Sequence, residues 1–200
     1  MKASLVPSAA RDEILRAVRA ALPPAVAAPA TPPRDVPRYT EDELIIQFSR
    51  AAAAAGALIV DANGDFGAHL KHVVSDAHEI LSLVPGVVST IPTPSDPHAL
   101  ATLDLFICQA TLGVAESGAV WFATPDAIHR AALFIAQRVV IVIKASAIVA
   151  DLHDAYERIN VRANGFGAFV SGPSKTADIE QSMVVGAHGP KELTLIISTA

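Results

Sequence analysis

A chain of 200 residues, 52% of them hydrophobic, is long enough to bury one substantial core. Its formal net charge of −5 and its scattered Lys and Arg residues exclude a broad electrostatic surface for DNA or RNA, so no nucleic-acid partner is expected. The single cysteine, Cys108, excludes an internal disulfide and any metal or iron–sulfur site that needs several thiolates.

The first residues, "MKASLVPSAARDEIL", lack the continuous apolar region of a secretion signal. No stretch of the chain reaches the roughly 18 apolar residues that a membrane-spanning helix requires. Cys108 itself lies in the apolar segment "DLFICQA", where a buried and inert thiol is expected. These patterns predict a cytoplasmic protein with no membrane span.

Proline sets the first 37 residues apart, because seven of the fourteen prolines lie among them. Residues 11–22 carry apolar side chains at helical spacing, with Ser8 as a candidate N-cap. Residues 23–37 hold too many prolines for a helix or a central strand. We therefore expect an N-terminal helix and Pro/Ala-rich linker at 1–37, followed by a folded domain at 38–200. A frayed terminus is the alternative for the first segment.

Apolar strands and amphipathic helices alternate after residue 38. Thr40 and Glu43 have the spacing of a capping box at the start of a helix that ends at Gly56. Residues 113–123 form either one broken strand or a hairpin. The other expected strands are 57–60, 80–84, 104–110, 139–143, 167–171 and 193–198, and the other expected helices are 65–78, 125–137, 145–160 and a short one after Thr176. This order predicts an α/β fold, a mostly parallel sheet with helices on both faces.

Two polar loops follow apolar segments, where ligands bind in open α/β sheets. In "SGPSKTADIE", Gly172 and Pro173 form a turn, and Ser174 or Thr176 caps the expected helix. Free N–H groups at such a helix start, with Lys175 alongside, would suit an anion. A purely structural cap is the alternative, because Asp178 and Glu180 already place negative charge in the first turn.

The other loop, "AESGA", carries Glu116, which could act as a base, a nucleophile or a hydroxyl acceptor. A solvated loop carboxylate is the alternative. His188 lies in "GAHGP", whose glycines and proline shape the backbone around an imidazole that could shuttle a proton. A turn histidine bonded to the backbone is its alternative. His69 and His72 share a helix without a nearby acidic pattern, so no metal site is expected.

Three common motifs are absent. Pro173 occupies the lysine position of a P-loop, Val170 occupies the third glycine position of a dinucleotide fingerprint, and "AESGA" is not the nucleophile elbow of a serine hydrolase.

The segments "AESGAV", "SGPSKTADIE" and "VVGAHGPKELTLIIS" together resemble the lactate-utilisation protein C family, the LUD domain. The resemblance extends from about Gly56 to the C-terminus, and residues 171–190 are its most specific part. It implies a fold like that of glucosamine-phosphate deaminase, ribose-phosphate isomerase and CoA transferases. It also implies a part in oxidising L-lactate to pyruvate beside companion proteins that carry iron–sulfur clusters, with no cofactor in this chain.

Carried over by position, the resemblance implies a cleft for a small anionic ligand. Its catalytic candidates are Glu116, Asp178 and His188. Its ligand-binding candidates are Ser117, Gly118, Ser171, Gly172, Pro173, Ser174, Lys175, Thr176 and Gly189. The chain departs from the family where Ala119 replaces a threonine and where Gln137 and Val140 replace a proline and a histidine, which is consistent with an altered ligand site.

Three functions follow as hypotheses. The chain could be a non-redox subunit of a lactate dehydrogenase-type complex. It could also be an independent enzyme on a sugar phosphate or acyl-CoA, or a binding module for a small carboxylate without turnover.

Overall fold

The computed structural model describes residues 9–24, 26, 27, 29, 38–61, 66–160, 165–177 and 183–199. The chain divides into two units, Met1–Pro37 and Arg38–Ala200. In the first unit, α1 (Ala9–Ala21) is the helix predicted from residues 11–22, and it buries none of its side chains. Ser8, the candidate cap of this helix, lies outside the described residues.

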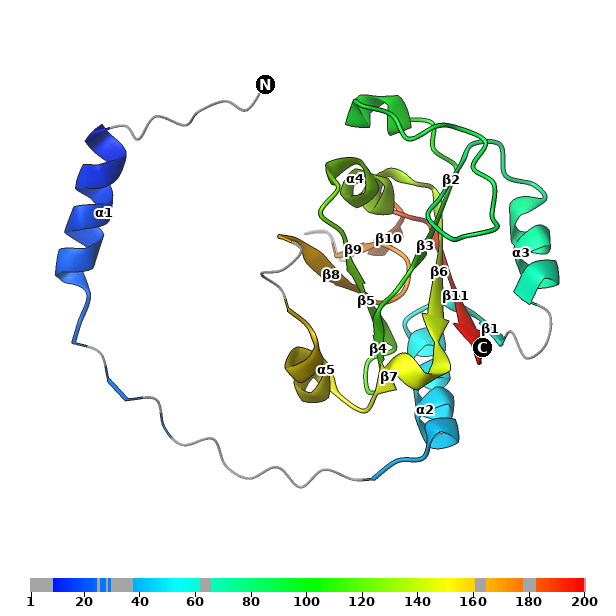
Figure 1. Ribbon diagram of the computed structural model, residues 1–200, viewed down its shortest axis with the longest axis horizontal. Coiled ribbons are helices and arrows are strands. Elements are labelled where there is room, and N and C mark those ends of the chain that lie inside the picture. The colour runs from blue at the N-terminus through cyan, green and yellow to red at the C-terminus, as the bar shows by residue number, and fades with distance from the viewer. Residues whose placement is uncertain are drawn as a thin grey trace. The chain divides into compact units, whose positions relative to one another are not determined.

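A five-stranded parallel sheet forms the centre of the second unit (Figure 1). Its strand order is β1-β11-β6-β3-β2, and every neighbouring pair is parallel. The strands are β1 (Leu58–Asp61), β2 (Ile80–Ser82), β3 (Leu105–Gln109), β6 (Arg138–Lys144) and β11 (Glu192–Ser198). The predicted mostly parallel α/β architecture is therefore confirmed.

A second sheet of four strands has the order β7-β4-β5-β8. Its strands are β4 (Leu112–Val114), β5 (Ala119–Ala123), β7 (Ile148–Val149) and β8 (Gly167–Val170). Residues 113–123 thus form a hairpin, one of the two alternatives that the sequence left open. Because β5 is antiparallel to both β4 and β8, these two strands run in the same direction and end at the same edge of the sheet.

Helices lie on both faces of the parallel sheet (Figure 1). Leu70 of α3 packs on one face, whereas the other face is covered by α2, α4 and the second sheet. The helices are α2 (Glu41–Ala54), α3 (Phe66–Val74), α4 (Ala127–Ile135) and α5 (Leu152–Arg158), with short 3-10 turns at Pro97–Leu100 and Ala145–Ala147. Across the described ranges, no helix is both long and apolar enough to cross a bilayer.

The capping box at the start of α2 forms as predicted. The Thr40 hydroxyl accepts a hydrogen bond from the Glu43 amide at 3.3 Å, and the Glu43 carboxylate accepts one from the Thr40 amide at 2.8 Å. Each residue thereby satisfies a backbone donor that a helix start leaves unpaired. These hydrogen bonds from Thr40 also lower the pKa of Glu43.

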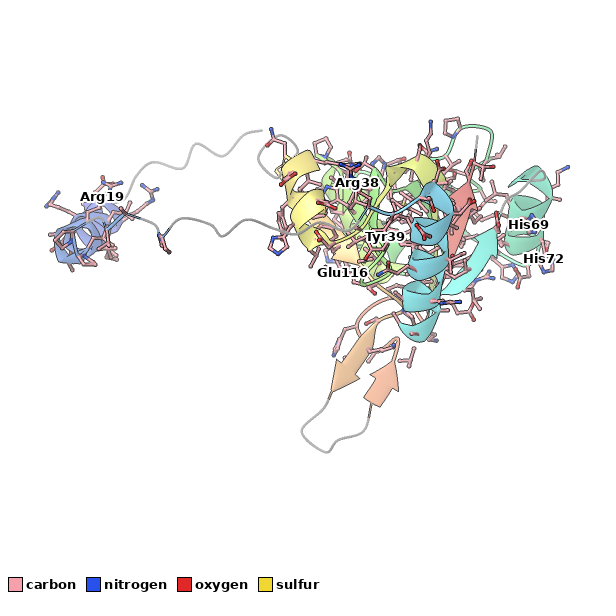
Figure 2. The ribbon with its side chains drawn as sticks, turned by 90° about the horizontal axis from the view of Figure 1, so that it is seen from below. Arg19, Arg38, Tyr39, His69, His72 and Glu116 are labelled. Atoms are coloured by element: carbon pink, nitrogen blue, oxygen red, sulfur yellow. The ribbon has the colours of Figure 1, made fainter. Side chains whose placement is uncertain are left out.

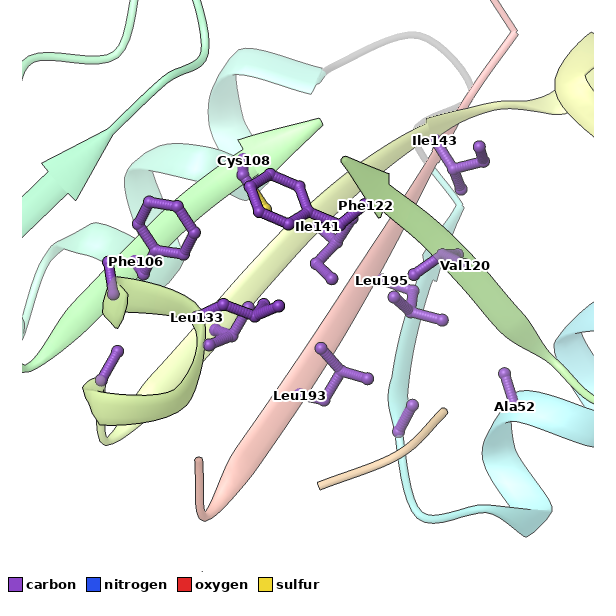
Figure 3. Close-up of a cluster of buried hydrophobic side chains, with 14 of the residues drawn as sticks. Ala52, Phe106, Cys108, Val120, Phe122, Leu133, Ile141, Ile143, Leu193 and Leu195 are labelled. Carbon is purple, nitrogen blue, oxygen red and sulfur yellow. The ribbon is translucent and has the colours of Figure 1, made fainter. Parts of the chain in front are cut away.

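The main core lies between the two sheets (Figure 3). Strands β3, β6 and β11 contribute one wall, β5 contributes the opposite wall, and α2 and α4 close the ends. The labelled members are Ala52, Phe106, Cys108, Val120, Phe122, Leu133, Ile141, Ile143, Leu193 and Leu195. Burial raises the pKa of the Cys108 thiol, so the predicted inert thiol is confirmed.

The predicted helix at 145–160 is wrong in its first half. Ile148 and Val149 form β7 instead and pair with Gly113 and Val114 of β4. These β-branched side chains fit a pleated surface, and both are buried there. The helix begins only after Asp151, whose carboxylate caps it by accepting from the Asp154 amide.

The predicted helix after Thr176 is also wrong at both of its described ends. Lys175–Ala177 forms β9 and Met183–Val185 forms β10, and the two strands are antiparallel. Figure 2 shows this hairpin extending away from the rest of the second unit. The β-branched residues Thr176, Val184 and Val185 favour strands over a helix, and cross-strand pairing outweighs the local capping pattern. Asp178 and Glu180 lie outside the described residues.

Candidate functional site

The two polar bends that the sequence singled out lie next to each other. The Ser171 hydroxyl donates a hydrogen bond to the Ser117 carbonyl oxygen at 3.1 Å. The topology explains this contact, because β4 and β8 run in the same direction on either side of β5 and both end at the same edge. The carboxyl ends that meet belong to the second sheet, not to the parallel one.

The end of α2 packs directly against both bends. A Cβ atom on Gly118 would lie 2.1 Å from the Ala52 nitrogen, and one on Gly172 would lie 2.1 Å from the Ala55 carbonyl oxygen. Both glycines have a positive φ, 62° and 69°. The Lys175 ammonium donates a hydrogen bond to the same Ala55 oxygen. These residues therefore hold the last turn of α2 against the second sheet.

Glu116, labelled in Figure 2, is exposed, and its carboxylate contacts the start of α5. It accepts a hydrogen bond from the Leu152 amide at 2.9 Å, and its own amide donates to the Ala150 carbonyl at 3.0 Å. A carboxylate at this position satisfies an unpaired helix N–H and faces the positive end of the helix. The structure thus gives Glu116 a capping contact, and its catalytic role stays a prediction.

Ser117 has a buried hydroxyl oxygen with no hydrogen-bond partner among the described residues. Its backbone carbonyl is the acceptor for Ser171, so the serine contributes to the bend through its main chain.

A hollow of about 410 Å³ has the Ser171 bend as part of its wall. It is bounded by the end of α4, by β8, and by residues 171–175 and 188–190. The predicted site residues that line it are Ser171, Gly172, Pro173, Ser174, Lys175, His188 and Gly189. Glu116, Ser117, Gly118 and Thr176 are not among its lining residues. The predicted site is therefore divided between this hollow and the neighbouring bend.

Two of the backbone positions expected to bind an anion have no free N–H group. The Ser174 amide donates to the Pro190 carbonyl at 2.9 Å, and Pro173 has no amide hydrogen. Because β9 replaces the expected helix start, the predicted helix-based anion cradle is wrong. The basic side chains that line the hollow are Lys175 and His188, and its described lining includes no carboxylate.

Comparison with known proteins decides the family of this domain. Residues 95–198 match the LUD domain. The chain belongs to the LUD domain family. The matched segment contains both polar bends and the hollow, so the site described above lies within the LUD domain.

Several curated relatives share this region. The Lactate utilization protein C of Bacillus pumilus (strain SAFR-032) is 35% identical over 83 residues, which cover 38% of this chain and 35% of that protein. The protein of the same name from Shouchella clausii (strain KSM-K16) is 33% identical over 100 residues, which cover 47% of this chain and 43% of that protein. The chain therefore matches less than half the length of these relatives.

A solved structure supports the fold. The crystal structure of a DUF162 family protein from Deinococcus radiodurans superposes with a TM-score of 0.61 at 17% sequence identity. The superposition covers 80% of this chain and 99% of that one. At this identity the similarity bears on the fold alone.

The second unit also contains an ionic cluster that the sequence patterns did not reveal, and two of its three residues, Asp104 and Arg138, lie in the LUD match. Arg138 donates to both carboxylate oxygens of Asp104, at 3.1 and 3.0 Å, and to Asp76 at 3.0 Å. These hydrogen bonds lower the pKa values of Asp104 and Asp76 and raise the pKa of Arg138. Asp104 and Arg138 each stand at the start of an apolar strand. Opposite charges at matching positions of two neighbouring strands were the sequence signal that could have predicted this ion pair.

The remaining histidines form no metal site in the part of the chain that the structure describes. His69 and His72 lie on α3 (Figure 2), and no cluster of three or more His, Cys, Asp or Glu side chains with metal-binding geometry occurs among the described residues.

Proposed function

We propose that this chain is a non-redox subunit of an assembly that oxidises L-lactate to pyruvate together with iron–sulfur partner proteins. The observation that carries the proposal is the similarity of its LUD domain to proteins named Lactate utilization protein C. The oxidation removes two electrons and two protons from lactate, and the electrons must pass to a redox group.

The cysteine content supports assigning the iron–sulfur clusters to partner proteins. Clusters are held by several cysteine thiolates, whereas this chain has only Cys108. That thiol is fully buried, and burial raises its pKa, which disfavours the thiolate that a metal needs.

Deletion of the gene tests the proposal. A deletion strain should lose growth on L-lactate but keep growth on pyruvate, and a plasmid copy should restore growth on lactate. Purification of the tagged chain from lactate-grown cells should recover iron-containing proteins. Unchanged growth on lactate after deletion, together with the absence of co-purifying iron, would reject the proposal.

A second candidate function is binding of a small anionic ligand by the isolated chain. The hollow favours this function, because it places two serines, a lysine and a histidine beside apolar walls. Candidate ligands are a small carboxylate, a sugar phosphate or an acyl-CoA. Ligand-dependent melting without turnover would identify a binding module, whereas turnover by the isolated chain would identify an enzyme. Glu116, Asp178 and His188 remain the predicted catalytic residues in that case.

A further inference from the structure

The hollow beside His188 is much larger than lactate. Its volume is about 410 Å³. Lactate occupies on the order of 150 Å³, if each of its non-hydrogen atoms takes up somewhat less than the ~30 Å³ of a liquid water molecule. A ligand that excludes water from the hollow therefore needs a larger body than lactate has.

The polar part of the lining suits an anion. Ser171 and Ser174 line it with hydroxyl groups, and Lys175 and His188 line it with nitrogen donors. No carboxylate side chain opposes them among the described lining residues. The Ser171 hydroxyl already donates to the Ser117 carbonyl, and one Lys175 N–H donates to the Ala55 oxygen. The Ser174 hydroxyl, the other Lys175 N–H groups and His188 can donate to a ligand carboxylate without repulsion from a neighbouring negative charge.

The apolar part of the lining suits an apolar group. Leu133 and Phe134 at the end of α4 line it, as do Ala168 and Val170 of β8. Phe134 is 49% exposed, so about half of its side-chain surface is open to a ligand. Its ring packs edge-on against Phe166, with centroids 6.5 Å apart, so the wall has a defined position.

We infer that this hollow binds the carboxylate of a 2-hydroxy or 2-oxo acid whose side chain is longer and more apolar than the methyl group of lactate. The choice of a 2-hydroxy or 2-oxo acid rests on the proposed function. The inference that the ligand has an apolar body and a negative charge rests on the lining residues alone. A sugar phosphate fits less well, because its hydroxyl groups would face the apolar wall and the Ser174 amide is already bonded to Pro190.

Isothermal titration calorimetry on the full chain tests the inference with L-lactate, 2-hydroxyhexanoate and 3-phenyllactate. Affinity should rise about fourfold for each additional buried methylene, so that 2-hydroxyhexanoate and 3-phenyllactate bind at least tenfold more tightly than L-lactate. The amide of 3-phenyllactate, which lacks the charge, should bind at least tenfold more weakly than the acid. Equal affinities for L-lactate and the longer acids, equal binding of the amide, or preferential binding of glucose 6-phosphate would overturn the inference.

Two variants locate the binding site. His188→Ala should weaken binding of 3-phenyllactate roughly tenfold, whereas His153→Ala, an exposed histidine on α5 outside the hollow, should not. Phe134→Ala should weaken binding of 3-phenyllactate roughly tenfold and leave L-lactate unaffected. Circular dichroism should show that both variants are folded. If both folded variants bind 3-phenyllactate like the unmodified chain, the ligand does not occupy this hollow.

The growth experiment separates this inference from the proposed function. If deletion abolishes growth on lactate but no acid binds in the hollow, the inference fails alone. If the longer acids bind but the deletion strain grows normally on lactate, the proposed function fails alone.

Discussion

Gly118 and Gly172 show how single residues bring the two polar bends and α2 together. Each has a positive φ, and at each position a side chain would collide with the backbone of α2. The two loops that the sequence predicted to bind a ligand thus also pack against α2, and their local sequence does not predict this contact. The role of these two glycines is therefore set by their positive φ and by the closeness of α2, and the local sequence shows neither.

Gly118→Ala should destabilise the protein far more than a positive φ alone explains. The added methyl would lie 2.1 Å from the Ala52 nitrogen, so α2 would have to move. We expect a loss of about 3 kcal/mol or more in the free energy of unfolding, measured with urea. Gly165→Ala is the matched control, with a φ of 66° and, apart from its chain neighbours, no atom of the described residues within 4 Å of the added Cβ, and it should cost about 1 kcal/mol. Equal losses in the two variants would show that contact with α2 is unimportant.

At the scale of elements, the start of α5 depends on a residue from another strand pair. Asp151 caps the helix locally, and Glu116 from the β4–β5 turn satisfies the Leu152 amide. The contact spans 36 positions in the sequence, so no local pattern could predict it. The helix is shorter than the sequence indicated because the preceding residues Ile148 and Val149 form β7.

Glu116→Ala should lower the free energy of unfolding by about 1 kcal/mol, because the Leu152 amide loses its acceptor. Glu116→Gln keeps an amide oxygen that can accept the same hydrogen bond and should cost less. Thermal melting of both variants measures the difference. If Glu116→Ala melts at the temperature of the unmodified chain, the capping contact does not contribute to stability.

At the scale of the whole second unit, the Arg138 cluster joins three segments that are distant in sequence. Asp76 follows α3, Asp104 precedes β3, and Arg138 begins β6. Adjacent parallel strands bring the last two together, because Leu105 of β3 is paired with Arg138. The cluster thus connects the layer that contains α3 to the central sheet.

Asp104→Asn should lower the free energy of unfolding by roughly 1–3 kcal/mol near pH 7, because Arg138 loses a charge-assisted pair of hydrogen bonds. The pKa of Asp104 is lowered in the folded state, chiefly by its hydrogen bonds to Arg138. Its stabilising contribution is therefore complete above the unfolded pKa of about 3.9 and is lost as the pH falls through the lower folded pKa.

Urea unfolding at several pH values measures this effect. The unmodified chain and the Asp104→Asn variant should differ at pH 7 and converge in acid, whereas Glu157→Gln, an exposed change on α5, should show no such trend. A difference that is constant with pH would contradict the assigned role of the carboxylate.

The amino-acid sequence by itself determined the alternation of strands and helices, the parallel sheet, the capping box at Thr40 and the buried state of Cys108. These features depend on local periodicity, capping chemistry and composition, which a linear pattern records. It also identified residues 171–175 and 188–189, which do line one hollow.

Only the tertiary structure decided what those loops do. The pairing of β9 with β10 replaced a helix that local capping residues favoured, and the common direction of β4 and β8 brought Ser117 to Ser171. Glu116 bonds to the start of α5 and does not line the hollow that His188 lines. Such outcomes depend on strand pairing and side-chain packing between segments that are far apart in the chain, and local sequence carries little information about either.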